Sequence, residues 1–172
     1  MFRHHGTSAR IAAPAILAVV FWIGPGAAAP ASAPSLTVTG LIHTPLALTA
    51  ADLAAMPRTT LSISDDNGNK AVYDGVPVQE ILKRAGAPSG KELRGPNMAL
   101  GVVARASDGY RVLFSLAEFD PAFHEATILL ADRRYNKPLD SREGPLRLVV
   151  PGEKRHARWV RGITDLQVFQ AR

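Results

Sequence analysis

A short basic and aromatic segment near the end of the chain carries the residue types best suited to hold a ligand. An apolar run over residues 146–150 ends at Pro151-Gly152, and four cationic side chains and a histidine then fall within eight positions around a tryptophan. These residues are Lys154, Arg155, His156, Arg158, Trp159 and Arg161. Such a segment can hold a flat, anionic or carbonyl-rich ligand by stacking and hydrogen bonding. It also fits an ordinary solvated basic loop.

Other chemical patterns in the sequence are weak. The chain contains no cysteine, which excludes a thiolate nucleophile and a thiolate metal ligand. His124-Glu125 lacks the second histidine of a metalloprotease helix, and the histidines show no metal-ligand spacing. No serine lies in a nucleophile elbow, and no glycine-rich phosphate loop is present. We therefore expect neither a catalytic residue nor a metal site.

The first 31 residues have the pattern of an export signal. Arg3 and Arg10 precede an apolar stretch over residues 11–23 that is too short to span a bilayer comfortably. Ala29-Pro30-Ala31 fits a signal-peptidase site, so we expect cleavage after Ala31 and a periplasmic protein with a single domain over residues 32–172. The alternative is an uncleaved membrane anchor. The absence of an Arg-Arg pair favours the general secretory route.

The charge and size of the remaining chain exclude some classes of protein. Removing residues 1–31 takes away two of the 20 Lys and Arg and none of the 15 Asp and Glu, which leaves a net charge of 18 − 15 = +3. Such a mild excess does not indicate a nucleic-acid partner. The remaining 141 residues (172 − 31) lack cysteine and must therefore be stabilised by a hydrophobic core, which this length can supply.

Alternating and apolar runs predict more strands than helices. Strands are expected over residues 35–42, 59–64, 71–73, 99–105, 110–114, 127–131, 146–150 and 163–169. Thr49 with Asp52, and Ser115 with Glu118, resemble capping boxes that begin short helices. Residues 74–77 open the clearest helix, which ends at Gly86. Together these elements predict an α+β fold with a mixed, curled β-sheet.

Several motifs in order resemble the molybdopterin-binding domain of the sulfite oxidase family over residues 36–169. The motifs are LTVTGL from Leu36, Tyr73-Asp74-Gly75-Val76-Pro77 before a helix, Asp108-Gly109-Tyr110, ILLADRRYNKPL from Ile128 and GPLRLVVPG from Gly144. Each motif is weak alone, and the ordered set is specific. The resemblance implies the fold of that domain and a pterin ligand.

Three features depart from the pattern of the family enzymes. Family enzymes bind molybdenum through a cysteine on the strand before the Tyr-x-Gly-x-Pro motif, and the equivalent position here lies at or beside Ile63. An isoleucine cannot replace a soft thiolate ligand. Glu143 stands where family enzymes tend to have a histidine. Family enzymes that reach the periplasm usually carry a twin-arginine signal, which is missing here. The resemblance is therefore to the small, cysteine-free periplasmic pterin-binding subset.

The resemblance gives candidate roles to three residues of the basic segment. Trp159 is expected to stack on the pterin ring, and the alternative is a core tryptophan that bridges two elements. Arg155 and Arg158 are expected to hydrogen-bond ring or side-chain oxygens, or to stack on the ring. The alternative for both arginines is a solvated basic loop.

Two further candidates lie elsewhere in the sequence. Asp132 is expected to accept two N–H bonds from the amino-pyrimidine edge of the pterin. Alternatively, Asp132 pairs with Arg133, Arg134 or Arg158. Tyr110 is expected to close the pocket, or to be structural, and Asp74 is expected to be a turn residue.

The sequence thus predicts a non-enzymatic periplasmic protein that binds a reduced pterin without molybdenum. The resemblance also implies coupling to an inner-membrane signalling protein that controls cyclic-di-GMP. One alternative is a molybdenum-cofactor oxidoreductase of the sulfite oxidase type, or its non-catalytic accessory. Another is an interaction module that has lost the ligand.

Overall fold

The computed structural model of the chain describes residues 1–2, 35–64 and 68–171. The expected signal over residues 1–31, with cleavage after Ala31, lies outside the described residues apart from residues 1–2. The described residues from 35 onward belong to one compact unit. Within these ranges, none of the helices is long and apolar enough to cross a membrane.

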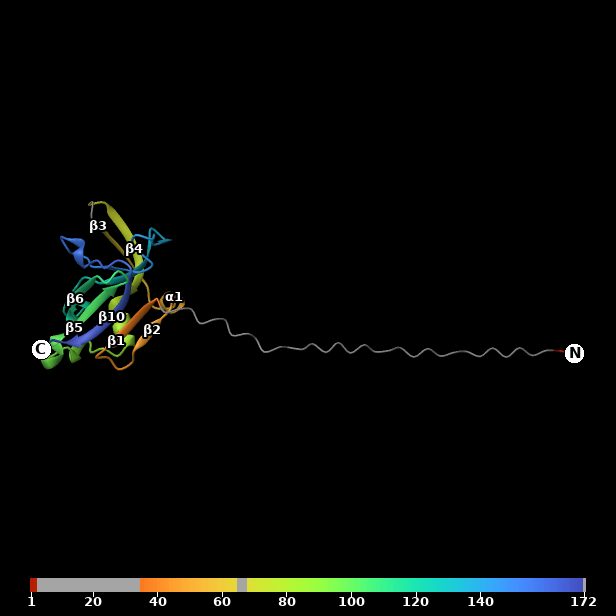
Figure 1. Cartoon of the computed structure of the whole chain (residues 1–172), viewed down its shortest axis with the longest axis horizontal. Helices are drawn as coiled ribbons and strands as arrows, with labels where there is room; N and C mark the ends of the chain where they lie inside the picture. Colours follow the sequence, from red (N-terminus) through yellow and green to blue (C-terminus); the bar gives the residue numbers. More distant parts are fainter. Residues whose placement is uncertain (3–34, 65–67, 172) are drawn as a thin grey trace. The chain divides into compact units, whose positions relative to one another are not determined.

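The first sheet is mixed and has the strand order β2-β1-β10-β5-β6. Its strands are β1 (Leu36–Gly40), β2 (Leu46–Leu48), β5 (Leu100–Ala106), β6 (Arg111–Ser115) and β10 (Ile163–Gln170). β1 and β10 run parallel, while the other pairs are antiparallel. Leu36 and Val38 of β1 are buried and alternate with partly exposed threonines, as the period of a half-buried strand requires. Figure 1 shows β5, β6 and β10 side by side.

The second sheet is antiparallel and carries one side of the candidate site. Its strands are β3 (Thr59–Ser64), β4 (Lys70–Pro77), β7 (Leu129–Arg134), β8 (Lys137–Pro138) and β9 (Arg147–Val149). The path is β3-β4-β7-β8, and β9 also pairs with β7. Figure 1 shows β3 and β4 together, away from the first sheet. Buried residues of both sheets belong to one hydrophobic cluster, in which Tyr73 and Phe114 are fully buried.

The helices are short, and two of them begin at the capping boxes that the sequence predicts. Helix α1 (Ala50–Ala54) starts with a capping box between Thr49 and Asp52, and the 3₁₀ helix η3 (Leu116–Phe119) starts with one between Ser115 and Glu118. Helix α2 (Val78–Arg84) buries its apolar face, and Gly86 follows at a positive φ of 72°. The predicted α+β class is confirmed.

Three details differ from the sequence prediction. The strands form two sheets instead of one curled sheet, although the first sheet is mixed as expected. Residues 74–77, expected to open the helix with Asp74 in a turn, are the end of β4. Gly75 permits this extension, because a Cβ there would lie 2.0 Å from the carbonyl oxygen of Leu130 on β7. Residues 89–97, for which the sequence analysis gives neither a helix nor a strand, contain the 3₁₀ helix η1 (Gly90–Glu92) and the start of the 3₁₀ helix η2 (Gly95–Ala99).

Candidate functional site

A cavity of about 400 Å³ lies between the end of β3 and the segment after β9. In Figure 1 that segment, drawn in blue, lies beside β3. The cavity therefore joins Ile63, near the end of β3, to the basic and aromatic segment. Its lining residues are Ile63, Ser64, Pro151, Gly152, Glu153, Lys154, His156 and Trp159.

Local backbone pairing fixes the segment that forms one wall of this cavity. The three residues of β9 are buried, and Gly152 permits the following turn because its φ is 82°. The amide of Leu148 donates to the carbonyl oxygen of Val160 at 2.8 Å, which closes the segment into a loop. The 3₁₀ helix η4 (His156–Arg158) occupies the returning half. The loop therefore presents its aromatic residues from a defined position.

Trp159 is a core residue whose indole also borders the cavity. Its exposed fraction is 4%, and its Nε1–H donates to the carbonyl oxygen of Val150 at 2.8 Å. Tyr73 packs edge-on at a centroid distance of 6.1 Å. His156 stacks on the indole at 3.8 Å with an interplanar angle of 17°. The core role that the sequence left open is thus present, and stacking on a pterin stays a prediction.

Arg158 is an ion-paired anchor and not a freely solvated side chain. Its guanidinium pairs with Glu153 at 2.5 Å and with Glu118 at 2.8 Å, and it lies over the ring of Phe114. Burial opposes the charged form, but the hydrogen bonds to Glu153 and Glu118 outweigh it and raise the pKa of Arg158. Arg158 is not among the residues that line the cavity. The ion pair with Glu118 connects the loop to η3. Direct contact of Arg158 with a pterin stays a prediction.

Arg155 belongs to the same loop, and Tyr110 contacts this loop from the position before β6. Arg155 is exposed and directly precedes η4. Tyr110 is 48% exposed, and its hydroxyl donates to the carbonyl oxygen of Ala157 at 2.8 Å. Tyr110 therefore supports the loop from the β6 side. Neither residue is in the cavity lining, so their assignment to ligand binding stays a prediction.

Asp132 pairs with an arginine that the sequence did not indicate. Two guanidinium nitrogens of Arg58 lie 3.2 and 2.5 Å from the two carboxylate oxygens of Asp132. Arg58 also contacts Asp74 at 3.2 Å. The hydrogen bond to Asp132 raises the pKa of Arg58, against the opposing effect of burial. Arg133, Arg134 and Arg158 are not its partners in these contacts, and Asp132 lies outside the cavity lining.

A buried cationic cluster beneath Trp159 was missed by sequence reasoning. Arg147 is 2% exposed, and its Nη1 donates to Glu143 at 2.6 Å and to the hydroxyl of Tyr73 at 3.2 Å. Its guanidinium carbon lies 5.1 Å from the indole centroid of Trp159. Arg134 also contacts Glu143, at 3.3 Å. The available signal was an arginine inside the apolar run over residues 146–150, since buried charges require partners.

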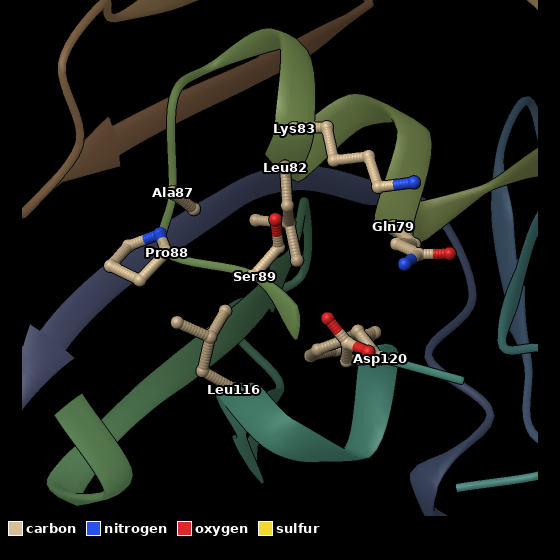
Figure 2. A pocket seen from close by; sticks show the side chains of 9 residues that line it. Gln79, Leu82, Lys83, Ala87, Pro88, Ser89, Leu116 and Asp120 are labelled. Carbon is tan, nitrogen blue, oxygen red and sulfur yellow. The ribbon is translucent and has the colours of Figure 1, made fainter. Parts of the chain in front are cut away.

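A second cavity lies between α2 and η3 (Figure 2). Its volume of about 10 Å³ has room for about one water molecule. Asp120 is 5% exposed there and accepts backbone N–H bonds from Gly90 at 2.6 Å and Ala122 at 2.8 Å. This cavity is too small for a pterin, and Asp120 has a structural role.

Comparison with known proteins gives a family and a fold. A family model described as the oxidoreductase molybdopterin binding domain matches residues 27–172. Among solved structures, the sulfane dehydrogenase SoxCD from Paracoccus pantotrophus is similar, with a TM-score of 0.61 and 22% sequence identity. The match covers 79% of this chain and 38% of the SoxCD chain, and at this identity it supports the fold alone. No curated protein matches the chain.

Proposed function

Since the chain belongs to the oxidoreductase molybdopterin-binding domain family, we propose that it binds a reduced pterin without molybdenum in the cavity between Ile63 and Trp159. In this proposal the protein is a ligand sensor and not an enzyme. Family membership supports a pterin-type ligand. The absence of molybdenum and the sensor role rest on the residues of the cavity and on the resemblance to the cysteine-free subset.

The composition of the cavity wall is the observation that carries this proposal. A pterin is a flat bicyclic ring with a polar edge, so its site needs a flat apolar surface and nearby hydrogen-bonding groups. Ile63 and the stacked rings of His156 and Trp159 offer apolar surface. Ser64 and Lys154 offer polar groups at the same cavity. The cavity volume of about 400 Å³ lies within the range typical of small-molecule sites.

The donor groups of the cavity do not fit a thiolate-bound molybdenum. The side chain of Ile63 contains only carbon and hydrogen, and the sequence has no cysteine at any position. Over residues 35–64 and 68–171, no group of three or more His, Cys, Asp or Glu could hold a metal ion. The family name itself favours the second candidate, a molybdenum-cofactor oxidoreductase or its non-catalytic accessory.

We also propose that the protein is located in the periplasm and has a partner in the inner membrane. The export pattern over residues 1–31 supports a periplasmic protein, and the resemblance supports a partner in the inner membrane that controls cyclic-di-GMP. An amino-terminal sequence beginning at Ser32 in the periplasmic fraction is the expected result for location. For the partner, we expect capture of a membrane cyclase or phosphodiesterase that depends on added pterin. Capture that is unchanged by pterin would favour an interaction module without a sensor role.

Chemical analysis of the protein purified from its own organism separates the two main candidates. We expect a fluorescent pterin after oxidation of the denatured protein, in near-stoichiometric amount, and molybdenum far below one atom per chain by mass spectrometry. Stoichiometric molybdenum would establish the oxidoreductase candidate instead. Neither molybdenum nor a pterin, in a folded protein that also fails to bind added reduced pterin, would contradict both.

A further inference from the structure

His156 already occupies the aromatic surface that a ring ligand would use. Its imidazole stacks on Trp159 at a centroid distance of 3.8 Å and an interplanar angle of 17°. Both side chains line the same cavity. A centroid distance this short leaves no room for a second ring between them, because stacked rings are in van der Waals contact at such separations. A flat ligand in the cavity reaches this face of Trp159 only after His156 has moved.

We infer that His156 is a displaceable side chain that covers the stacking face of Trp159 in the ligand-free protein and rotates away when a fused-ring ligand binds. The inference rests on the proposed pterin function and adds a residue that determines specificity at the same site. His156 competes with the ligand for Trp159. Binding therefore has two parts, the loss of the imidazole–indole stack and the gain of the ligand–indole stack.

Contacts of the residues after His156 fix the backbone of this loop. A rotation of the His156 side chain alone can therefore uncover the indole of Trp159. The carbonyl oxygen of Ala157 accepts the hydroxyl of Tyr110 at 2.8 Å. Arg158 pairs with Glu153 and Glu118, and the indole of Trp159 is bonded to Val150. His156 itself is only partly buried. A change of rotamer leaves the backbone bonds of the loop in place, so the exchange needs no movement of the loop.

The competition selects for ring size. An imidazole overlaps a small part of an indole, whereas a fused two-ring system can cover most of it. A single-ring ligand gains about as much from stacking as it loses by displacing His156, while a bicyclic ligand gains more. The cavity is thus expected to prefer a pterin over a free pyrimidine that carries the same hydrogen-bonding edge.

Calorimetric titration of the purified full chain with tetrahydrobiopterin under anaerobic conditions tests the inference. Because an aromatic stack corresponds to about a twofold to tenfold change in affinity, His156→Ala is expected to bind more tightly by that factor. His156→Phe places a larger ring on the indole and is expected to bind more weakly than the native chain. The matched control is His43→Ala, since His43 is exposed and borders a different groove with Gly86 and Pro88.

The outcomes separate this inference from the proposed function. Measurable binding by the native chain, together with tighter binding by His156→Ala, supports the inference. Equal or weaker binding by a folded His156→Ala, with binding by the native chain, overturns the inference and leaves pterin binding intact. Absence of binding in both overturns both.

A spectroscopic measurement covers the case in which His156→Ala does not fold. The indole ring current shifts protons stacked above it upfield, so the ring protons of His156 should resonate upfield in the ligand-free full chain. The signal missing from His156→Phe identifies them among the five histidines of the sequence. Saturation with tetrahydrobiopterin should return them to ordinary positions. Upfield signals that persist at saturation would overturn the inference.

Discussion

The carboxylate of Glu143 accepts a hydrogen bond from Nη1 of Arg147 at 2.6 Å, and the arginine is almost completely buried. A buried guanidinium is tolerated only with partners, and the hydroxyl of Tyr73 supplies another one at 3.2 Å. This pair lies beneath the indole of Trp159. It therefore supports the aromatic wall of the proposed pterin cavity from the protein interior.

Removing the carboxylate of Glu143 should destabilise the fold strongly. Glu143→Ala leaves Arg147 with an uncompensated buried charge, a change that costs about 3–5 kcal/mol. Glu143→Gln keeps an acceptor oxygen and is expected to cost less. The midpoint of urea unfolding at an unchanged slope measures both. Glu125→Ala is the control, because Glu125 is exposed and its loss should matter by less than about 0.5 kcal/mol. Equal stability of Glu143→Ala and Glu125→Ala would contradict the burial of an Arg147 guanidinium that depends on Glu143.

Substitutions of Trp159 are expected to change the stability of the fold and the affinity for a pterin to different extents. Trp159→Ala removes a large buried ring and should cost about 3–5 kcal/mol in the free energy of unfolding. Trp159→Phe keeps a ring but leaves the carbonyl oxygen of Val150 without its indole donor, which costs about 1–3 kcal/mol. We expect Trp159→Phe to retain measurable pterin affinity. Loss of stability by Trp159→Ala comparable to that of an exposed residue would disagree with the burial of the indole.

Asp120 is expected to stabilise the connection between η1 and η3. Its carboxylate accepts backbone N–H bonds from Gly90 and Ala122 beside a water-sized cavity (Figure 2). Asp120→Ala leaves these donors without their acceptor and should cost about 1–3 kcal/mol. Asp108 offers a matched control, since it also accepts a backbone N–H, from Tyr110, but is exposed. Asp108→Ala should cost less than Asp120→Ala in thermal unfolding, and the reverse order would show that burial does not set the effect.

Asp132 was predicted to bind the pterin, but it lies outside the cavity lining. Because its ion pair with Arg58 is about a quarter exposed, Asp132→Asn should lower stability by no more than about 1 kcal/mol. We expect unchanged pterin affinity, since Asp132 does not line the cavity. A large loss of pterin affinity in a stable Asp132→Asn variant would instead support Asp132 as the carboxylate that hydrogen-bonds the pterin edge.

Local signals made much of the fold predictable. The capping boxes at Thr49 and Ser115 depend on residues three positions apart, so the sequence indicates them directly. Alternation of apolar residues located β3, β5 and β6 within one or two residues. The division into two sheets could not be predicted in this way, because it depends on pairing between distant strands.

The candidate site was predictable only in part. The resemblance implied the metal position at or beside Ile63 and a stacking role for Trp159, and both residues line the same cavity. The partner of Asp132 was not predictable, since Arg58 lies 74 residues away and the register of β4 against β7 shifts between Asp74 and Gly75. The stacking of His156 on Trp159 depends on the 3₁₀ turn of η4, which the sequence analysis did not indicate.

The central claim, a pterin in the cavity between Ile63 and Trp159, is tested most directly by a matched pair of substitutions on β3. Ser64 lines the cavity, whereas Ser62 is exposed two residues earlier on the same strand and does not line it. Isoleucine suits a strand at both positions, so both variants should fold. In anaerobic calorimetry with tetrahydrobiopterin, we predict saturable binding by the native chain and by Ser62→Ile, and at least about a tenfold loss for Ser64→Ile, the 1.4 kcal/mol step in binding free energy. Equal affinity of the two variants, or no binding by the folded native chain, would contradict the claim.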